Sequence, residues 1–440
     1  MTTAYAALDS LVELLKTVYG EGLQNQFNDE KMTYNQFPKS DRKPGGNGYV
    51  FGLRYARAQS SGARAEGAKL PPALTGQKDQ GKINARYVYD SLKISGPAIE
   101  TAKGNMAAFV DGLADEMDDH YQAIVVQLNR MAWGDGFGLL GTSSAAATPS
   151  TTVAWSVTFD NDRGVQYFQP GMLVDVFNSA GTTAITTCCG IRVSYIAPAT
   201  KTVTFEAVGQ TYLASHPNAT IAAYTNDATQ LASGDIFVAM GSRTPTHAAS
   251  DTPYEITGLD GLYDDGTLLT TFEDILLSTH PMWAAGIISN SGVKHPVTID
   301  RMLQACDLAQ TRSGKRPSII RMGLGQRRQY ANLLLPDVRF QPGKLNGGYE
   351  EVDFSAGDGS IKMVIDPMAQ PNSMYFEVDG AIKKYELMPL GWLNRDQSTL
   401  HQTQGYDTWE AALAVYTNLG VEQRSHLVKL TDLTEPTLYT

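Results

Sequence analysis

The sequence predicts an α+β fold in which two long projecting elements and a small β domain accompany a mixed α/β body. Three patterns lead to this prediction. Apolar residues alternate with period two over 49–59 and 82–94, as in strands. Apolar residues recur at three-, four- and seven-residue steps over 97–133 without an intervening proline, as in one long helix. Short alternating runs separated by turn residues fill 153–240, which predicts a small barrel or sandwich.

The chain begins with a predicted N-terminal arm, residues 1–48. Apolar residues at helical spacing over 5–18 predict a short helix, which Gly20 and Gly22 would end. The residues that follow are polar and irregular as far as Gly48, which predicts extended chain.

Residues 49–94 predict an extended β-hairpin whose arms are Tyr49–Gln59 and Lys82–Ile94. The arms are joined by a tip of roughly twenty residues, and connections of that length are usually either functional or disordered. A two-stranded ribbon is marginally stable by itself in water, so we expect its aromatic face to lie on another surface.

Residues 95–142 contain the second projecting element, a helix from about Pro97 to Trp133 that a glycine-rich stretch would end. At 1.5 Å per residue this helix would be about 55 Å long. The two elements carry opposite charge: 42–94 has ten Lys/Arg and three Asp/Glu (net +7), and 97–140 has two Lys/Arg and seven Asp/Glu (net −5). Because neither element looks able to bury itself, we expect a neighbouring copy of the chain to complete each.

Residues 143–256 predict an inserted β domain, with strands at Val153–Phe159, Met172–Phe177, Ile191–Ile196, Thr202–Ala207 and Ile236–Met240. The remainder, 257–440, predicts a mixed α/β region. Its predicted helices are Val297–Arg312, with Thr298 as the cap, and Gln326–Leu335. Its predicted strands are Pro317–Met322, Met363–Ile365, Ser373–Val378, Lys384–Leu390, Thr408–Tyr416 and Gln423–Leu430.

The composition is that of a globular protein. The 440 residues are 42% hydrophobic and 18% charged, and the net charge of −11 argues against wholesale wrapping of nucleic acid. Three cysteines, two of them adjacent (Cys188, Cys189 and Cys306), show no disulfide framework and favour a reducing compartment. The N-terminus lacks a signal-peptide pattern and no stretch approaches eighteen apolar residues, so we expect the protein to be made and to work in a cytoplasm.

No catalytic, cofactor-binding or metal-binding constellation is legible, so we predict that the chain is not an enzyme and needs no cofactor. The Gly-Lys pair at 314–315 lacks both the earlier glycine and the following Ser or Thr of a phosphate-binding loop. Asp260, Asp264 and Asp265 precede Gly266, but their spacing does not fit a calcium loop and favours turn chemistry.

Six basic residues lie between Asp307 and Asp337 with no acidic residue among them: Arg312, Lys315, Arg316, Arg321, Arg327 and Arg328. One interpretation is a patch that faces polyphosphate or an acidic neighbour. The other, a solvated helix–turn face, is slightly favoured because no aromatic residue beyond Tyr330 accompanies the run.

Several short motifs follow one another along these segments. They are Phe168-Gln-Pro-Gly-Met-Leu-Val-Asp-Val, Ser233-Gly-Asp-Ile-Phe, Gly258-Leu-Asp-Gly-Leu, Pro281-Met-Trp, Ile365-Asp-Pro, Met374-Tyr-Phe-Glu-Val-Asp, Trp392, Tyr406-Asp-Thr-Trp-Glu-Ala-Ala and Leu427-Val-Lys-Leu. Their order, and the order of the elements, resembles the major capsid proteins of tailed bacteriophages, which have the Hong Kong 97-type fold. Each motif is unspecific alone, and the resemblance covers nearly the whole chain.

The resemblance implies a coat protein that assembles as hexamers and pentamers into an icosahedral shell around double-stranded DNA, within a virion assembled in the cytoplasm of a bacterial host. It implies that the hairpin is an extended loop over the adjacent subunit, that 95–142 contains the spine helix of a peripheral domain, and that 257–440 completes the peripheral and axial domains. The expected inter-subunit contacts are basic residues of the loop: Arg54, Arg57, Arg64, Lys69 and Arg86.

Further partners follow from the same resemblance. Only about twenty residues precede the extended part of the arm, so we expect a separate scaffolding protein, together with a portal; a decoration protein is left open, and no covalent cross-link is predicted. Two other functions stay open at this point. One is an encapsulin-like cellular nanocompartment shell, and the other is a hydrolase or carbohydrate-binding protein built around the β segment.

Overall fold

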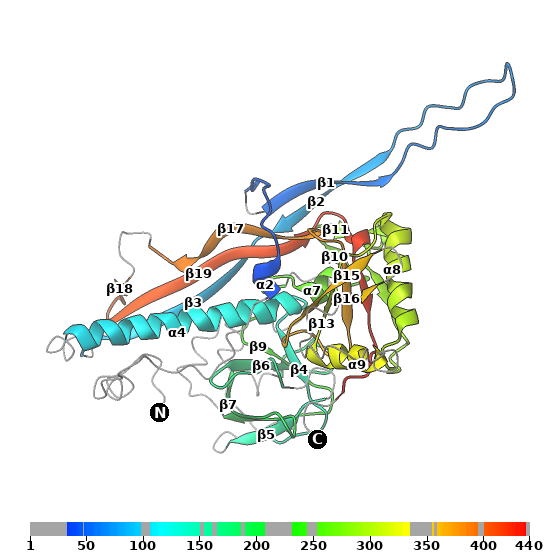
Figure 1. Cartoon of the computed structure of the whole chain (residues 1–440). Helices are drawn as coiled ribbons and strands as arrows, with labels where there is room; N and C mark the ends of the chain where they lie inside the picture. The colour runs from blue at the N-terminus through cyan, green and yellow to red at the C-terminus, as the bar shows by residue number, and fades with distance from the viewer. Residues whose placement is uncertain are drawn as a thin grey trace, which may run out of the picture.

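The computed structural model describes residues 33–46, 48–97, 106–149, 154–160, 165–185, 190–206, 231–243, 253–334, 354–355, 359–394 and 400–436. The helix predicted over 5–18 lies outside these residues. Figure 1 shows an elongated molecule in which a hairpin projects from one end and a long helix extends toward the other.

The projecting hairpin consists of strands β1 (Gly48–Ala56) and β2 (Gln77–Asn84), which pair antiparallel. The prediction of one continuous return arm over Lys82–Ile94 is wrong. The chain leaves the ribbon after β2 and continues as β3 (Arg86–Ser95), which pairs with β19 (Thr408–Val421) and not with β1. The ribbon that projects is therefore shorter than predicted, because the longer β19 takes the second half of the arm into its own sheet.

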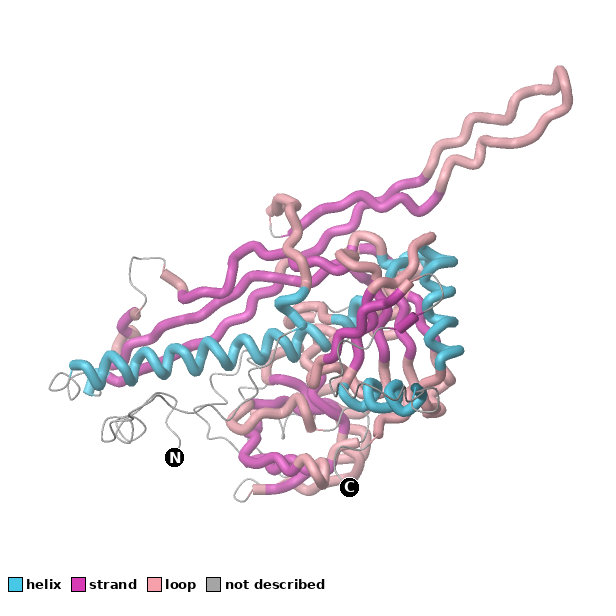
Figure 2. The backbone as a smooth tube through the Cα atoms, in the orientation of Figure 1, coloured by secondary structure: helices cyan, strands magenta, loops and turns pink. Residues whose placement is uncertain are grey.

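Strand β3 belongs to an antiparallel sheet with β19, β17 (Ile382–Trp392) and the short β18 (His401–Gln402). Helix α4 (Met106–Trp133) runs along this sheet (Figure 2). Leu92 is buried in a cluster against which Met117 of the helix packs. The sheet and the helix therefore form two layers that share an apolar seam.

Helix α4 ends at Trp133, where the glycine-rich stretch predicts its end. Its 28 residues span about 42 Å at 1.5 Å per residue. Its last turns are buried in the protein core, with Leu128 and Trp133 nearly inaccessible. The chain returns to this end at Gly258, where an added Cβ would lie 2.2 Å from the carbonyl oxygen of Met131, so only glycine permits the close approach.

A second sheet has six antiparallel strands and its own core. In sheet order they are β4 (Leu139–Thr142), β9 (Ile236–Ala239), β6 (Leu173–Phe177), β7 (Ile191–Ala197), β8 (Thr202–Glu206) and β5 (Trp155–Thr158). A bridge between Ser143 and Phe159 joins the two edge strands, which closes the sheet into a small barrel. The five strands predicted here are confirmed, whereas β4 was missed because four residues after a glycine-rich stretch are too few to show alternation.

A third sheet forms the mixed α/β body. In sheet order its strands are β12 (Gly286–Ile288), β20 (Val428–Leu430), β16 (Met374–Glu377), β13 (Ile319–Met322), β15 (Ser360–Ile365) and β14 (Phe354–Ser355). Helices α8 (Ile299–Ser313) and α9 (Leu324–Leu334) lie beside it (Figure 1). Thr298 accepts a hydrogen bond from the backbone N–H of Arg301, so the predicted cap is confirmed.

The strand predicted over Gln423–Leu430 is wrong in its first half. A 3₁₀ turn, η5 (Arg424–His426), precedes β20. The guanidinium of Arg424 is fully buried and donates to the carbonyl oxygens of Leu262 and Asp264. These contacts with a segment far away in sequence stabilise the 3₁₀ turn in place of a strand. A local sequence pattern could not show them.

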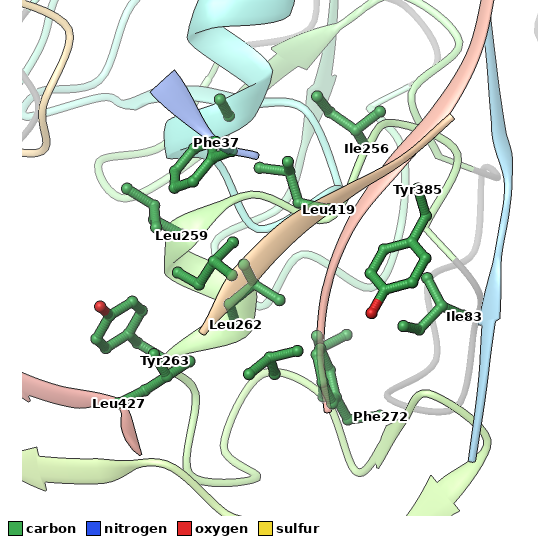
Figure 3. Close-up of a cluster of buried hydrophobic side chains, with 14 of the residues drawn as sticks. Phe37, Ile83, Ile256, Leu259, Leu262, Tyr263, Phe272, Tyr385, Leu419 and Leu427 are labelled. Carbon is green, nitrogen blue, oxygen red and sulfur yellow. The ribbon is translucent and has the colours of Figure 1, made fainter. Parts of the chain in front are cut away.

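Short elements complete the body: α2 (Thr33–Gln36), α7 (Leu259–Leu262), β10 (Thr271–Phe272), β11 (Ile275–Leu276) and η3 (Pro281–Trp283). Figure 3 shows side chains from the arm (Phe37), the hairpin (Ile83), α7 and the sheet strands β17 and β19 gathered in one buried cluster. The arm, the hairpin and the end of α4 thus share one core. None of the helices in the described ranges is long and apolar enough to cross a membrane.

Candidate inter-subunit surface

The tip of the hairpin, residues 57–76, extends beyond the body of the molecule (Figure 1). All residues from 61 to 70 are exposed, and the apolar side chains of Leu70 and Leu74 are 82% and 52% exposed. Ordering the backbone costs about 1–2 kcal/mol per residue, and a tip this exposed has little burial to offset that cost. The tip is therefore an exposed surface with little contact to the rest of the described chain.

The root of the hairpin is anchored to its own chain. Tyr49 and Phe51 are buried, and their rings lie 5.1 Å from Tyr385 and 5.8 Å from Trp283 between centroids. Phe51 also covers Gly81, where an added Cβ would lie 2.4 Å from the ring. The expectation that the hairpin cannot bury itself is wrong for this part, because the aromatic face of the ribbon lies on the body of the same subunit.

The basic residues predicted as contacts divide into two groups. Arg54, Arg57, Arg64 and Lys69 are exposed on the ribbon and its tip. Residues 48–84 contain six Lys/Arg and two Asp/Glu, a net charge of +4. Arg86 differs: it lies on β3 and is half-buried, and this burial lowers the pKa of its guanidinium to about 10. Arg86 lines a cavity at the hairpin root, so its predicted place on the projecting loop is corrected, while its contact with a neighbouring copy stays a prediction.

Helix α4 carries acidic residues toward the end of the molecule away from the hairpin (Figure 1). Residues 106–129 contain five Asp/Glu and no Lys or Arg. Asp118 and Asp119 are exposed, and the neighbouring His120 lies 2.8 Å from the carboxylate of Asp90 on β3. The hydrogen bond with Asp90 raises the pKa of His120. The exposed acidic residues Asp118 and Asp119 therefore lie on α4, away from the basic hairpin.

A groove of about 560 Å³ lies beside the hairpin, between β1 and η3. Tyr55, Met282 and Trp283 contribute its apolar walls, and Arg54 and Glu422 contribute charged groups. Met282 is 76% exposed. This concave surface adjoins the projecting ribbon, so a molecule that contacts the ribbon can also reach the groove.

The acidic cluster predicted to form a turn does so. The carboxylate of Asp264 accepts hydrogen bonds from the backbone N–H groups of Gly266, Leu268 and Leu269, at 2.9 to 3.0 Å. Asp260 forms an ion pair with Lys429. Among the described residues, no group of three or more His, Cys, Asp or Glu is arranged to hold a metal ion.

The basic run over 312–328 is neither a single patch nor a uniformly solvated face. Lys315 and Arg327 are exposed, as the solvated interpretation predicts. Arg321 is buried, lies 2.9 Å from the carboxylate of Glu377, and has its guanidinium 4.6 Å from the ring of Phe37. The pattern of charges along the sequence could not distinguish this buried ion pair from its exposed neighbours.

A buried carboxylate that sequence reasoning did not single out joins three elements. Asp366 accepts hydrogen bonds from the side chain of Thr33 in α2 and from Trp133 Nε1 at the end of α4, the latter at 3.1 Å. Its other oxygen accepts from the backbone N–H of Met368 at 2.7 Å. The only signal in the sequence is the Ile365-Asp-Pro motif, which carries no indication of partners so distant in the chain.

No protein-family model matches this sequence, and no curated protein sequence matches it. Solved structures similar to it are known. The capsid asymmetric unit of cyanophage A-1(L) is 11% identical, with a TM-score of 0.53 over 95% of this chain and 98% of that one. The capsid of Myoviridae phage XM1 is 10% identical, with a TM-score of 0.45 over 96% and 98%. The capsid of an empty GTA particle is 10% identical, with a TM-score of 0.42 over 99% and 100%.

The first of these three similarities exceeds a TM-score of 0.5 and carries the assignment of the fold. The identity of 11% limits that assignment to the fold. The alignment covers 95% of this chain, so the match does not rest on one common motif. The fold predicted from the order of elements is confirmed at this level, while the Hong Kong 97 subtype and the domain boundaries stay predictions. The chain has the fold of a bacteriophage major capsid protein.

Proposed function

We propose that the protein is the coat subunit of a phage capsid, which assembles as hexamers and pentamers into an icosahedral shell that encloses double-stranded DNA. It works as a structural component of the virion, after assembly in the host cytoplasm, and not as an enzyme. The observation that carries this proposal is the exposed hairpin tip. A projection of twenty residues with exposed leucines is explained by a neighbouring copy that covers it.

The distribution of charge supports contacts between copies in a head-to-tail arrangement. The basic hairpin and the acidic part of α4 lie toward opposite ends of the molecule (Figure 1). Contacts between two different patches are heterologous, and such contacts generate rings when the rotation closes. Arg54, Arg57, Arg64 and Lys69 are the proposed basic side of the contact, and Asp118 and Asp119 the proposed acidic side.

The roles of the segments follow from this proposal. The hairpin is the extended loop over the adjacent subunit, α4 is the spine helix, and the small barrel is the inserted domain. A separate scaffolding protein and a portal are the proposed further partners in assembly. Complementary fields supply orientation and register, while apolar burial at the groove and at the tip supplies most of the affinity.

The proposal is tested with the purified full chain by sedimentation and electron microscopy. We expect capsomers, or shell-like particles in the megadalton range, with or without a co-expressed scaffolding partner. A chain that stays a monomer or small dimer at high protein concentration, with and without that partner, would contradict it.

A charge reversal tests the head-to-tail contact. The variant Arg57→Glu/Arg64→Glu is expected to assemble about tenfold more slowly at low salt, because electrostatic steering of this size is typical of complementary patches. The difference should shrink at high salt, where exposed charges are screened. Light scattering during assembly measures both effects.

Two further variants separate this contact from a general effect of net charge. Adding Asp118→Lys/Asp119→Lys to the tip variant should restore part of the rate. The matched control Lys315→Glu/Arg327→Glu changes two exposed basic residues of the body by the same total charge and should assemble at the normal rate. Equal slowing in the control and the tip variant would rule out a specific role for the tip charges.

A further inference from the structure

A small cavity lies where the hairpin enters the body of the protein. It has a volume of about 100 Å³ and lies where β2 passes to β3. Asn84 and Arg86 line it from the two sides of the hairpin root, Glu273 lines it from the β10–β11 turn, and Asn418 lines it from β19. The cavity therefore lies between the hairpin root, the β10–β11 turn and β19.

Three buried polar atoms on these walls have no hydrogen-bond partner within the described part of the chain: Asn84 Oδ1, Arg86 Nε and Glu273 Oε2. Most buried polar atoms in native proteins are hydrogen-bonded, and each one left unpaired costs the full desolvation of that group. Three such atoms around one cavity, with donor and acceptor character mixed, point to a ligand that both donates and accepts. Water meets this requirement, and a cavity of about 100 Å³ has room for about three molecules at ~30 Å³ each.

Glu273 is also the residue that ties the hairpin root to the body. Its carbonyl oxygen accepts from the backbone N–H of Lys82 in β2 at 2.8 Å. Its carboxylate oxygen Oε1 accepts from the backbone N–H of Val421, at the end of β19, at 3.0 Å. Both Glu273 and Asp274 have positive φ, 52° and 62°, in a two-residue turn that ordinarily uses Asn-Gly. Strained backbone of this kind persists where surrounding contacts hold it, and it concentrates at functional joints.

The charged surroundings of the Glu273 carboxyl come from several elements. Burial raises its pKa to about 8, against the lowering effects of the hydrogen bond from Val421 and the charge of Arg424. The charge of Glu422 also raises the pKa of Glu273, and Tyr385 of β17 interacts with the Glu273 carboxyl. Lys82, Arg86 and Asp274 are the other charged groups at the cavity. At neutral pH the carboxyl is therefore mainly protonated, and its O–H can donate into the cavity.

We propose that the cavity holds ordered water that is hydrogen-bonded to Asn84, Arg86 and Glu273, and that this water-mediated contact, the joint, holds the hairpin root on the body. When Glu273 ionises, these hydrogen bonds weaken and the hairpin root separates from the body. Ionisation of a carboxyl whose Oε2 atom is buried is costly, and the charge of Arg424 offsets only part of that cost. The joint can relieve the remainder by opening further to solvent. The proposal concerns the hairpin root of the single subunit, so it does not depend on assembly and can fail or succeed separately from the proposed coat function.

The direction of the pH dependence follows from the two states. The closed joint keeps the Glu273 proton up to a pH of about 8, whereas the solvated carboxyl loses it near the ordinary value of 4.5. Between these values the closed state binds one more proton than the open state, so closure weakens as the pH rises and levels off above about 8. The equilibrium constant for opening is expected to rise about fiftyfold from pH 6 to pH 8, and only about twofold more above that.

Hydrogen–deuterium exchange of the full chain tests this proposal. Exchange of peptides that cover 78–90, corrected for the intrinsic effect of pH with the exposed tip as internal reference, should accelerate in the predicted manner between pH 6 and pH 8. In Glu273→Gln the side-chain amide still accepts a hydrogen bond from Val421 and donates into the cavity, but it does not ionise. The protection of the backbone amides in 78–90 should therefore stay nearly constant between pH 6 and pH 8. The matched control Asp274→Asn changes the neighbouring carboxyl of the same turn and should keep the normal pH dependence.

Two results would overturn the proposal. One is exchange at the root that is independent of pH in the natural chain, or equally dependent on pH in Glu273→Gln. The other is a high-resolution map, at pH 6, that shows buried water elsewhere but none within hydrogen-bond distance of Asn84 Oδ1, Arg86 Nε and Glu273 Oε2. The map tests whether ordered water occupies the cavity, and it needs no variant. It can therefore overturn the proposal even if Glu273→Gln does not fold.

Discussion

Replacing residues 57–76 with Asn-Gly is expected to give a folded subunit that forms no shells. Gln77 pairs with Ala56 at the end of the ribbon, and Asn-Gly is the favoured two-residue connection between antiparallel strands, so β1 and β2 remain paired. The root keeps the buried Tyr49 and Phe51, which hold the ribbon on the body. What is lost is the exposed tip, which contributes nothing visible to the core of its own subunit.

The effect on assembly is expected to be close to complete, because a closed shell repeats each contact many times and multiplies a small loss per contact. Circular dichroism and the unfolding midpoint should match those of the natural chain, while electron microscopy should show no particles. The matched control replaces Leu70 and Leu74 by alanine and keeps the length of the tip; it should assemble weakly. Normal particles from the tip replacement would exclude the hairpin as the main contact between copies.

Local sequence patterns predicted those elements whose partners are close in the chain. The end of α4 at Trp133, the cap Thr298 and the five barrel strands each follow from residues within one turn or one strand. The order of the elements also predicted the fold. The hairpin shows where this reasoning stops, because alternation continues from β2 through β3 although the two strands belong to different sheets.

The residues that the sequence misplaced are those held by distant partners. Arg86 and Arg321 resemble solvated basic residues in the sequence, yet one is half-buried at the hairpin root and the other forms a buried ion pair. Glu273 gives no signal at all, since its burial depends on β2 and β19, which are far away in the chain. Charge counts described the exposed tip correctly because no described part of its own subunit covers it.

The buried carboxylate of Asp366 is the clearest example of a structural role that depends on distant partners. It lies directly after β15 and is almost inaccessible to solvent. Four residues from three segments donate to it: Thr33, Asn129 and Trp133 to one oxygen, and Met368 to the other. The arm, the end of α4 and the body sheet are thus connected through one side chain.

Removing this carboxylate in Asp366→Ala is expected to destabilise the protein by about 3–5 kcal/mol, because several buried donors would lose their acceptor together and each unpaired group costs about 1–3 kcal/mol. The loss should appear as a lower urea midpoint and as faster exchange of the amides in 33–37, which Asp366 holds against the end of α4. The matched control Asp379→Ala removes an exposed carboxylate from the same sheet region and should change stability by no more than about 0.5 kcal/mol. If the two variants were equally stable, the connection between arm, helix and body would have to come from the surrounding apolar core alone, and Asp366 would only be accommodated there.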